Sequence, residues 1–214
     1  MQEQLRRLLI VGAGGHGRVA ADCADCSKEW DSIAFLDDRW PDLTSNLDWP
    51  VIGTLKTLPD ILAPNDHLFV AIGDGASRMR ILRELKASGR QIATIIHPRA
   101  VVSSRAKIGA GTLVVAGAVV NVGTRTGEGC IINTGATVDH DCQLAAGVHI
   151  CPGAHVAGTC TIGEESWVGV GASVRQGIRL GARVLIGAGA AVVSDFSDGE
   201  AGLGVPARVV KRKD

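Results

Sequence analysis

Residues 132–156 read INTGATVDHDCQLAAGVHICPGAHV, with a branched aliphatic residue at every sixth place: Ile132, Val138, Leu144, Ile150 and Val156. The same spacing runs without a break from Val102 to Val192, and fifteen of its sixteen places hold branched aliphatics. Neither the 3.6-residue period of a helix nor the two-residue alternation of a long strand produces this pattern. The repeat therefore predicts short flat strands that alternate with corners.

The other places of the repeat describe these corners. The fifth place is always small or branched, and the fourth is glycine in ten of fifteen complete repeats. Glycine is expected where the backbone must turn with a positive φ. Three flats and three corners close one triangular coil of eighteen residues, and about five coils stack at a strand spacing of roughly 4.8 Å. The sequence thus predicts a parallel β-helix of hexapeptide repeats.

The overall composition argues against several kinds of partner. The chain has 22 Lys and Arg and 22 Asp and Glu, a net charge of zero, without a basic tract. Nucleic acid and membrane surfaces are therefore not expected partners. No apolar run reaches the length of a membrane span, and the first residues lack a signal-peptide cleavage pattern, so we expect a cytoplasmic protein. The Cys23 and Cys26 pair has no second pair at zinc spacing, and we expect no metal site.

The first hundred residues show the pattern of an open α/β sheet. Residues 8–11 form a short apolar strand, followed by the glycine turn GAGGHG at 12–17 and a helical stretch to about Cys26. Such a turn points backbone N–H groups and the positive end of the helix at a phosphate. A second strand, 33–36, ends at Asp37, where an acid can bind a ribose hydroxyl. We predict a Rossmann-like nucleotide-sugar-binding domain at 1–98 and the β-helix with a C-terminal tail at 99–214.

The size of the first domain limits its ligand. Only two further strands, 68–72 and 92–96, and a helix at about 76–88 precede the repeats, so the sheet has room for about four strands. A dinucleotide needs two such halves, and the size therefore favours a mononucleotide. A tight turn without any ligand is the alternative interpretation of the glycines.

One corner of the β-helix departs from the glycine rule. Asp139, His140 and Asp141 occupy places two to four of the repeat that begins at Val138, and Asp141 stands where most repeats have glycine. A positive φ is tolerated outside glycine mainly by Asp and Asn. Since packing does not require an acid beside a histidine at a corner, this pair indicates a general base oriented by a carboxylate. An exposed histidine on a polar turn is the alternative.

Counting along the repeat places further residues around this corner. Gly158 follows His140 by eighteen residues and should lie directly above it, where its N–H is a candidate oxyanion donor. His149 occupies an outward place on another flat and can line a groove. Leu113, Val115, Val119 and Leu185 also point outward and give the column apolar faces that self-association would cover.

These features together resemble a known family. The motifs are, in chain order, GAGGHG, the acid after the second strand, INTGA-x-V-x-H-D-C, H-I-x-P-G and the terminal G-V-P-A-R at residues 204–208. They resemble the bacterial sugar acetyltransferases related to sialic acid O-acetyltransferases, and most closely those that N-acetylate a 4-amino group on a nucleotide-linked deoxysugar. The resemblance covers essentially the whole chain and is specific for the family, though not for the substrate.

The resemblance implies a left-handed β-helix, a homotrimer, and acetyl-CoA lying in the groove between neighbouring columns. It makes His140 the general base and Asp141 the acid that orients it, in an enzyme of bacterial glycan biosynthesis. The acetyl-CoA contacts that it implies are His149, Gly158, Gly204, Pro206 and Ala207. The substrate contacts that it implies are Gly12, Gly14, His16, Gly17, Asp37, Gly73 and Asn133.

Two alternatives to the sugar N-acetyltransferase stay open from the sequence. The acceptor can be a hydroxyl, as in acetylation of sialic acid, although the intact glycine turn favours a substrate that carries a nucleotide. The protein can also be a non-catalytic β-helix scaffold, in which case replacing His140 would have no effect on its function.

Overall fold

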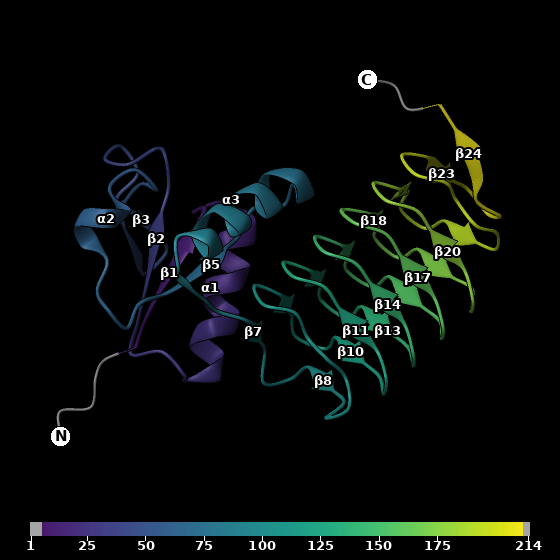
Figure 1. Ribbon diagram of the computed structural model, residues 1–214, viewed down its shortest axis with the longest axis horizontal. Helices are drawn as coiled ribbons and strands as arrows, with labels where there is room; N and C mark the ends of the chain where they lie inside the picture. Colours follow the sequence, from purple (N-terminus) through teal and green to yellow (C-terminus); the bar gives the residue numbers. More distant parts are fainter. Residues whose placement is uncertain (1–5, 212–214) are drawn as a thin grey trace. The chain divides into compact units, whose positions relative to one another are not determined.

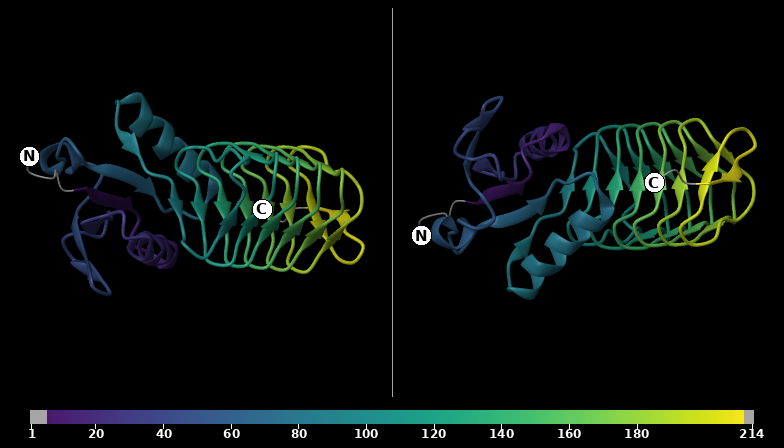
Figure 2. Two further views of the ribbon diagram at one scale, coloured as in Figure 1. Left: turned by 90° about the horizontal axis from the view of Figure 1, so that it is seen from below. Right: turned by 90° about the horizontal axis from the view of Figure 1, so that it is seen from above.

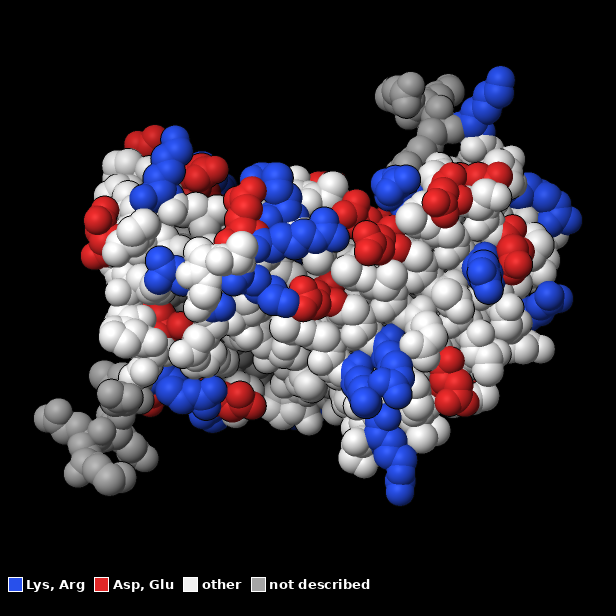
Figure 3. All heavy atoms as spheres, in the orientation of Figure 1, with Lys and Arg blue, Asp and Glu red and all other residues white. Residues whose placement is uncertain are grey.

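The computed structural model describes residues 6–211, so the first five and last three residues of the predicted domains lie outside it. The chain divides between Pro98 and Arg99 into two compact units, an α/β unit and a β-helix (Figure 1). Acidic and basic side chains are mixed over most of the face seen in Figure 3. No helix of residues 6–211 is long and apolar enough to cross a membrane.

The first unit contains a mostly parallel sheet in the order β3-β4-β2-β1-β5-β6. Its strands are β1 (Arg7–Val11), β2 (Ser32–Leu36), β3 (Ser45–Asn46), β4 (Trp49–Gly53), β5 (His67–Val70) and β6 (Gln91–Ile92). Its helices are α1 (Gly15–Ser27), α2 (Leu58–Ile61) and α3 (Gly75–Ala87), and β7 (Ile95–Ile96) comes last. The expected four strands are too few. β3 and β4 were not predicted from the sequence, because β3 has only two residues and Pro50 within β4 is unusual in a strand.

The central strands of this sheet are buried. β1 lies between β2 and β5, and its residues Leu8 to Ile10 are fully buried. α3 begins after Asp74, whose side chain accepts a hydrogen bond from the Ser77 N–H at 2.8 Å. The carboxyl ends of β1, β2 and β5 thus share one edge of the sheet, where ligands of open α/β sheets bind.

The second unit is a column of stacked coils with short strands and corners (Figure 2). Its strands form three sheets, which we call faces 1 to 3, so the column is triangular in section. Face 1 carries β8 (Val101–Val102), β10 (Val119–Val120), β13 (Thr137–Val138), β16 (His155–Val156), β19 (Ser173–Val174) and β22 (Ala191–Val192). Face 2 carries β11 (Arg125–Thr126), β14 (Gln143–Leu144), β17 (Thr161–Ile162) and β20 (Arg179–Leu180). Face 3 carries β9 (Leu113–Val114), β12 (Ile131–Ile132), β15 (His149–Ile150), β18 (Trp167–Val168), β21 (Leu185–Ile186), β23 (Ala201–Leu203) and the antiparallel β24 (Arg208–Val210).

Partner strands in the coils are eighteen residues apart, as in the pairs Val120↔Val138 and Val138↔Val156. Their aliphatic side chains fill the interior, and those of Val120, Val138 and Val156 are at most 1 % exposed. Cys142 and Cys160 also point inward and are fully buried, and all six cysteines are free thiols. The predicted parallel β-helix is therefore confirmed, with its core on the first and fifth places of the repeat.

The corners turn at the fourth place of the repeat. Each of the ten predicted glycines has a φ between 62° and 76°, and Asp141 has a φ of 57°. Thr159, Glu165 and Arg183 also turn with a positive φ, so the expected preference for Asp or Asn is wrong. The N–H of the fourth place donates to the preceding coil, at 2.7 Å from Arg183 to the Glu164 carbonyl. This ladder of hydrogen bonds overrides the local preference of the side chain.

The outward apolar residues differ from the expectation. Leu113 and Val115 are buried, with 0 % and 4 % exposure, whereas Val119 and Leu185 are partly exposed. Leu113 pairs with Ile131 of the next coil on face 3. Two exposed valines stand at corners, Val122 with 47 % and Val170 with 54 % exposure, and Val101 on face 1 is 64 % exposed. Apolar surface available for self-association is therefore found on edges of the column as well as on its faces.

Candidate active site

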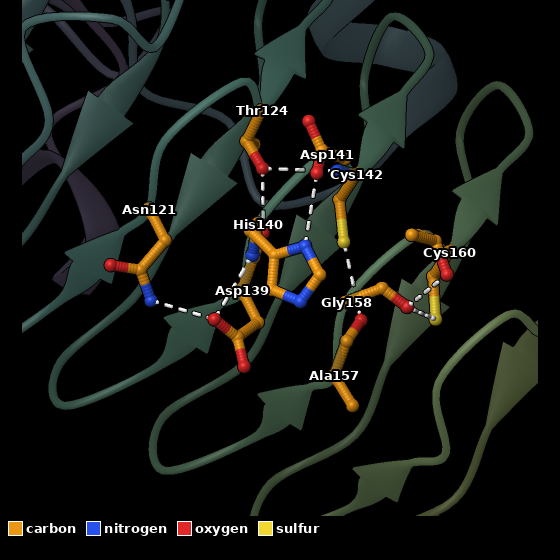
Figure 4. A network of polar contacts seen from close by, with 10 residues as sticks. Asn121, Thr124, Asp139, His140, Asp141, Cys142, Ala157, Gly158 and Cys160 are labelled. Atoms are coloured by element: carbon orange, nitrogen blue, oxygen red, sulfur yellow. Dashed lines mark hydrogen bonds and ion pairs between the residues drawn. The ribbon is translucent and has the colours of Figure 1, made fainter.

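His140 stands at the corner after β13, on the edge between faces 1 and 2, which we call the His140 edge (Figure 4). Its side chain is half exposed, and its Nδ1 lies 3.0 Å from Oδ2 of Asp141. Neighbouring side chains of a flat strand point to opposite faces and could not meet in this way. The positive φ of Asp141 supplies the bend that turns both outward. The structure thus brings the two predicted catalytic residues together.

Two glycines on the adjacent coils leave room for this pair. A Cβ on Gly158, one coil toward the C-terminus, would lie 2.5 Å from Nε2 of His140. A Cβ on Gly123, one coil toward the N-terminus, would collide with Oδ1 of Asp141. The Thr159 N–H donates to the His140 carbonyl at 2.9 Å and ties the two corners together. Nδ1 therefore faces the carboxylate, and Nε2 faces the backbone of Gly158.

Asp139 braces the same corner, a contact that the sequence analysis missed. Its Oδ1 accepts hydrogen bonds from the His140 backbone N–H at 3.0 Å and from Nδ2 of Asn121 at 2.8 Å. The Thr124 hydroxyl donates to the Asp139 carbonyl at 2.6 Å and accepts from the Cys142 N–H at 3.1 Å. Asn121 precedes Asp139 by eighteen residues, so the repeat itself carried the signal for this pairing.

The charges around His140 favour its protonated form. The hydrogen bond that His140 donates to Asp141 raises the pKa of His140 above its ordinary value of 6.5, and the negative charges of Asp139 and Asp141 act in the same direction. Because the carboxylate accepts a hydrogen bond from the Nδ1–H, Nε2 is the nitrogen that can take a proton from a reacting group. The corner is thus arranged as a general base.

Asn133 and His149 form a second polar cluster at a different corner. Asn133 follows β12 on the edge between faces 3 and 1, the Asn133 edge, and its Nδ2 lies 3.1 Å from Nε2 of His149. The Thr134 N–H donates to Oδ1 of Asn133 at 2.8 Å, which turns the amide nitrogen toward the ring. His149 also packs against Trp167, at 4.1 Å between ring centroids, and is only 6 % exposed. His149 therefore keeps the outward place expected for it, while Asn133 and Trp167 cover most of its ring.

These two clusters do not meet within one chain. The His140 edge and the Asn133 edge lie at opposite ends of the face 1 strands, since β13 separates Asn133 from His140 along the chain. The predicted site residues of the β-helix are thus divided between two edges of the column.

The glycine turn of the first unit is shaped by close packing. Gly12 has a φ of 101° and donates its N–H to the Leu36 carbonyl at 2.8 Å. A Cβ on Gly17 would collide with the Gly12 carbonyl oxygen, so Gly17 lets α1 approach the turn. Gly14 precedes α1 and has open space around it. Gly12 and Gly17 therefore build the turn, whereas Gly14 leaves the N-terminus of α1 accessible.

Asp37 holds this turn in place. Its Oδ2 accepts a hydrogen bond from the Ala13 N–H at 2.7 Å, and Arg39 approaches both carboxylate oxygens, at 2.7 and 3.0 Å. The hydrogen bond from Arg39 is the main reason why the pKa of Asp37 falls to about 2. The Asp37 carboxylate thus already has partners within the chain. The expected contact of Asp37 with a ribose stays a prediction.

A pocket of about 250 Å³ opens at the carboxyl ends of β1 and β2. Gly12, Asp37 and Asp38 line it together with apolar side chains such as Leu55 and Ile72. Among the residues predicted to bind the nucleotide, Gly12 and Asp37 thus belong to the wall of one cavity. Its position is the one at which open α/β sheets bind ligands.

His16 and Gly73 lie near a buried arginine. Arg78 is 1 % exposed and donates to the carbonyls of Ile72 and Gly73, at 2.7 and 2.8 Å. Burial, with the positive charge of Arg78, lowers the pKa of His16 to about 4. His16 is therefore neutral near pH 7 and can offer a hydrogen bond without a charge.

Gly204, Pro206 and Ala207 form the turn between β23 and β24, at the C-terminal end of the column. The Gly204 carbonyl accepts from the Ala191 N–H at 3.1 Å, and the Ala207 N–H donates to the Ala191 carbonyl at 2.8 Å. Ala207 is buried and Pro206 exposed. Within residues 6–211 no group of three or more His, Cys, Asp or Glu side chains could hold a metal ion.

A triangular β-helix with an exposed histidine and carboxylate at one corner defines a hexapeptide-repeat acyltransferase. The PglD N-terminal domain family matches residues 7–85. The UDP-N-acetylbacillosamine N-acetyltransferase of Bacillus subtilis strain 168 is 35% identical over 114 residues, which are 52% of each chain. The match therefore spans about half the length of this curated relative.

Two solved structures are similar over nearly the whole chain. The acetyltransferase domain of PglB from Neisseria gonorrhoeae FA1090 is 45% identical, with a TM-score of 0.93 over 96% of this chain and 100% of its own. PerB from Caulobacter crescentus, in complex with CoA and GDP-perosamine, is 37% identical, with a TM-score of 0.90 over 95% of this chain and 97% of its own. The chain belongs to this family of sugar N-acetyltransferases, with a PglD-type N-terminal domain and a left-handed β-helix. The predicted fold class and family resemblance are confirmed.

Proposed function

We propose that the protein transfers the acetyl group of acetyl-CoA to the amino group of a nucleotide-linked amino-deoxysugar, in bacterial glycan biosynthesis. The observation that carries this proposal is the His140–Asp141 pair, with Nε2 held beside Gly158 on an exposed edge. The relatives support it, since the PglB domain has also been solved with acetyl coenzyme A and PerB with CoA and GDP-perosamine.

In this reaction the residues of the His140 edge have separate tasks. Nε2 of His140 takes a proton from the sugar amine as the amine nitrogen attacks the thioester carbonyl carbon. Asp141 keeps the ring oriented and stabilises the imidazolium that forms. The tetrahedral intermediate then expels the CoA sulfur, which receives the proton from His140 and leaves as a thiol. Gly158 donates its N–H to no group within residues 6–211, so this N–H is available to the developing oxyanion.

We also propose a homotrimer with its active sites between subunits. One chain holds His140 on one edge and Asn133 with His149 on another, so a neighbouring copy is needed to join the two clusters. Exposed valines support this arrangement, since Val122 stands on the His140 edge and Val170 on the Asn133 edge. Threefold symmetry would cover both. Light scattering should then give three times the 22.2 kDa of the chain, and a monomeric mass would contradict the arrangement.

The nucleotide part of the substrate is assigned to the first unit, with Gly12, Gly14, His16, Gly17, Asp37 and Gly73 around it. The pocket beside Gly12 and Asp37 and the open N-terminus of α1 support this assignment. Asn133 and His149 would then contact sugar and acetyl-CoA from the neighbouring subunit, and Gly204, Pro206 and Ala207 the far end of acetyl-CoA. The cytoplasmic location stays a prediction.

The direct test is thiol release from acetyl-CoA in the presence of UDP-, GDP-, CMP- and dTDP-linked amino sugars, with mass spectrometry of the sugar product. We expect one nucleotide sugar to become N-acetylated, and expect no release when its amino group is replaced by a hydroxyl. Acetylation of free sialic acid alone would favour O-acetyl transfer instead. A protein that releases no thiol with any acceptor would be a scaffold.

A further inference from the structure

The His140 edge continues for several coils toward the C-terminus, and Arg175 is the next charged residue on it. The ladder pairs Val138↔Val156 and Val156↔Val174 place Arg175 two coils beyond Asp139. The Gly177 N–H donates to the Gly158 carbonyl at 3.0 Å, which stacks these corners directly. At the usual strand spacing, two coils correspond to about 10 Å along the column.

The two ring nitrogens of His140 face opposite ends of the column. Nδ1 faces Asp141, whose carboxylate lies over Gly123 on the N-terminal side, and Nε2 faces Gly158 on the C-terminal side. The acetyl group must therefore lie on the C-terminal side of the ring. From there an elongated donor can pass over the small residues Ala157 and Gly158, whereas the carboxylates of the His140 corner would repel its phosphates on the other side.

Arg175 is available to an anion. Its side chain is exposed, and within residues 6–211 its guanidinium makes no hydrogen bond or ion pair. The three coils that follow His140 toward the C-terminus have nine corner residues on this edge. Arg175 is the one basic residue among them; the others are Ala157 to Thr159, Gln176, Gly177 and residues 193–195. The next carboxylate of the edge, Asp195, accepts a hydrogen bond from the Arg179 N–H at 2.8 Å and is thus engaged elsewhere.

We propose that Arg175 binds the pyrophosphate of acetyl-CoA and sets the affinity for the acetyl donor. The inference rests on the proposed function. In acetyl-CoA the extended pantetheine arm separates the thioester from the pyrophosphate, so a residue that binds the pyrophosphate must stand coils away from His140, as Arg175 does. A guanidinium fits phosphate oxygens with two parallel hydrogen bonds, which a lysine cannot reproduce.

Calorimetric titration with CoA, in the absence of any acceptor, tests the contact without relying on turnover. We expect Arg175→Ala to weaken CoA binding about tenfold, the effect of losing a charge-assisted hydrogen bond. Arg175→Lys should recover part of this loss. Arg183→Ala is the matched control, because Arg183 is also exposed in the same coil but stands at another corner. Equal affinity of the wild type and Arg175→Ala would overturn the proposal, as would a wild type that binds no CoA.

Shortened donors then locate the contact. With acetyl-CoA we expect Arg175→Ala to raise KM for the donor about tenfold, with kcat and KM for the sugar unchanged. The tenfold rise in KM for the donor should also appear with acetyl-dephospho-CoA, which keeps the pyrophosphate. It should be absent with S-acetylpantetheine, which has no phosphates beyond the arm. A penalty that persists with S-acetylpantetheine, or disappears with acetyl-dephospho-CoA, overturns the assignment. A wild type that acetylates no nucleotide sugar, yet binds CoA through Arg175, contradicts the proposed function alone.

Discussion

The His140 corner and the glycine turn of the first unit both place an aspartate beside a basic side chain, yet the two aspartates do different work. The Asp141 side chain is 65% exposed, and its hydrogen-bond partner is the ring of His140. The Asp37 side chain is 12% exposed and holds the Ala13 N–H together with Arg39. Asp141 therefore orients a side chain that reacts, whereas Asp37 fixes the course of the backbone. Substitutions should separate chemistry from stability along the same line.

His140→Ala gives the largest expected effect. Loss of the general base should lower kcat by about 10²- to 10⁴-fold, while CoA binding and thermal stability stay close to the wild type because the ring is half exposed. Steady-state kinetics, calorimetry and thermal denaturation measure the three quantities. His155→Ala is a suitable control, because His155 is exposed on face 1 and bonds to the Thr137 hydroxyl at 2.9 Å. Unchanged turnover would remove His140 from the mechanism.

Gly158→Ala tests whether the position of the ring matters as much as its presence. The added Cβ would lie 2.5 Å from Nε2 and must displace the imidazole. We expect kcat to fall by on the order of 10- to 100-fold, the usual cost of a misplaced catalytic group. The same substitution made in His140→Ala should cause little additional loss, since no ring is left to displace. Independent losses in the double variant would show that Gly158 acts through something other than His140.

Asp141→Asn separates orientation from charge. The carboxylate raises the pKa of His140, and the base is active only when neutral, so activity is lost as the pH falls through that pKa. Removing the charge should therefore move the acidic limb of the kcat profile to lower pH and reduce the maximal rate. Asp139→Asn should shift the limb in the same direction by less, because it bonds the backbone rather than the ring. A limb that stays in place would contradict this account.

Asp37→Asn should act on stability, with the smallest effect on the chemical step. The pKa of Asp37 is about 2 in the folded protein against an ordinary 3.8, so its carboxylate stabilises the fold above pH 4 and loses this contribution as the pH falls toward 2. We expect the variant to lose on the order of 1–2 kcal/mol of unfolding free energy at pH 7. Urea denaturation at several pH values should show the difference from the wild type shrinking below pH 4. A constant difference would indicate another cause.

The sequence predicted most where the repeat is long. Sixteen aligned places specify the β-helix, and counting eighteen residues along the sequence places Gly158 beside His140, as the structure has it. The same count would have paired Asn121 with Asp139. Contacts outside the repeat were harder to predict, because the Arg39 partner of Asp37 depends on how a loop folds back. Counting eighteen residues also pairs His149 with Trp167, but the count does not say that the two rings pack edge to face and bury His149. An outward place in the repeat does not by itself give the extent of burial.

The eighteen-residue coil also fixes the spacing between residues along the column. Inserting or deleting one full coil would move every later residue by a single strand spacing and leave it on the same edge, with the interior pattern unchanged. Inserting or deleting six or twelve residues would instead move the later residues onto a different edge. The distance between the proton acceptor and a group further up the edge can therefore change only in fixed steps, which gives lineages of such proteins a discrete way to fit donors of different length.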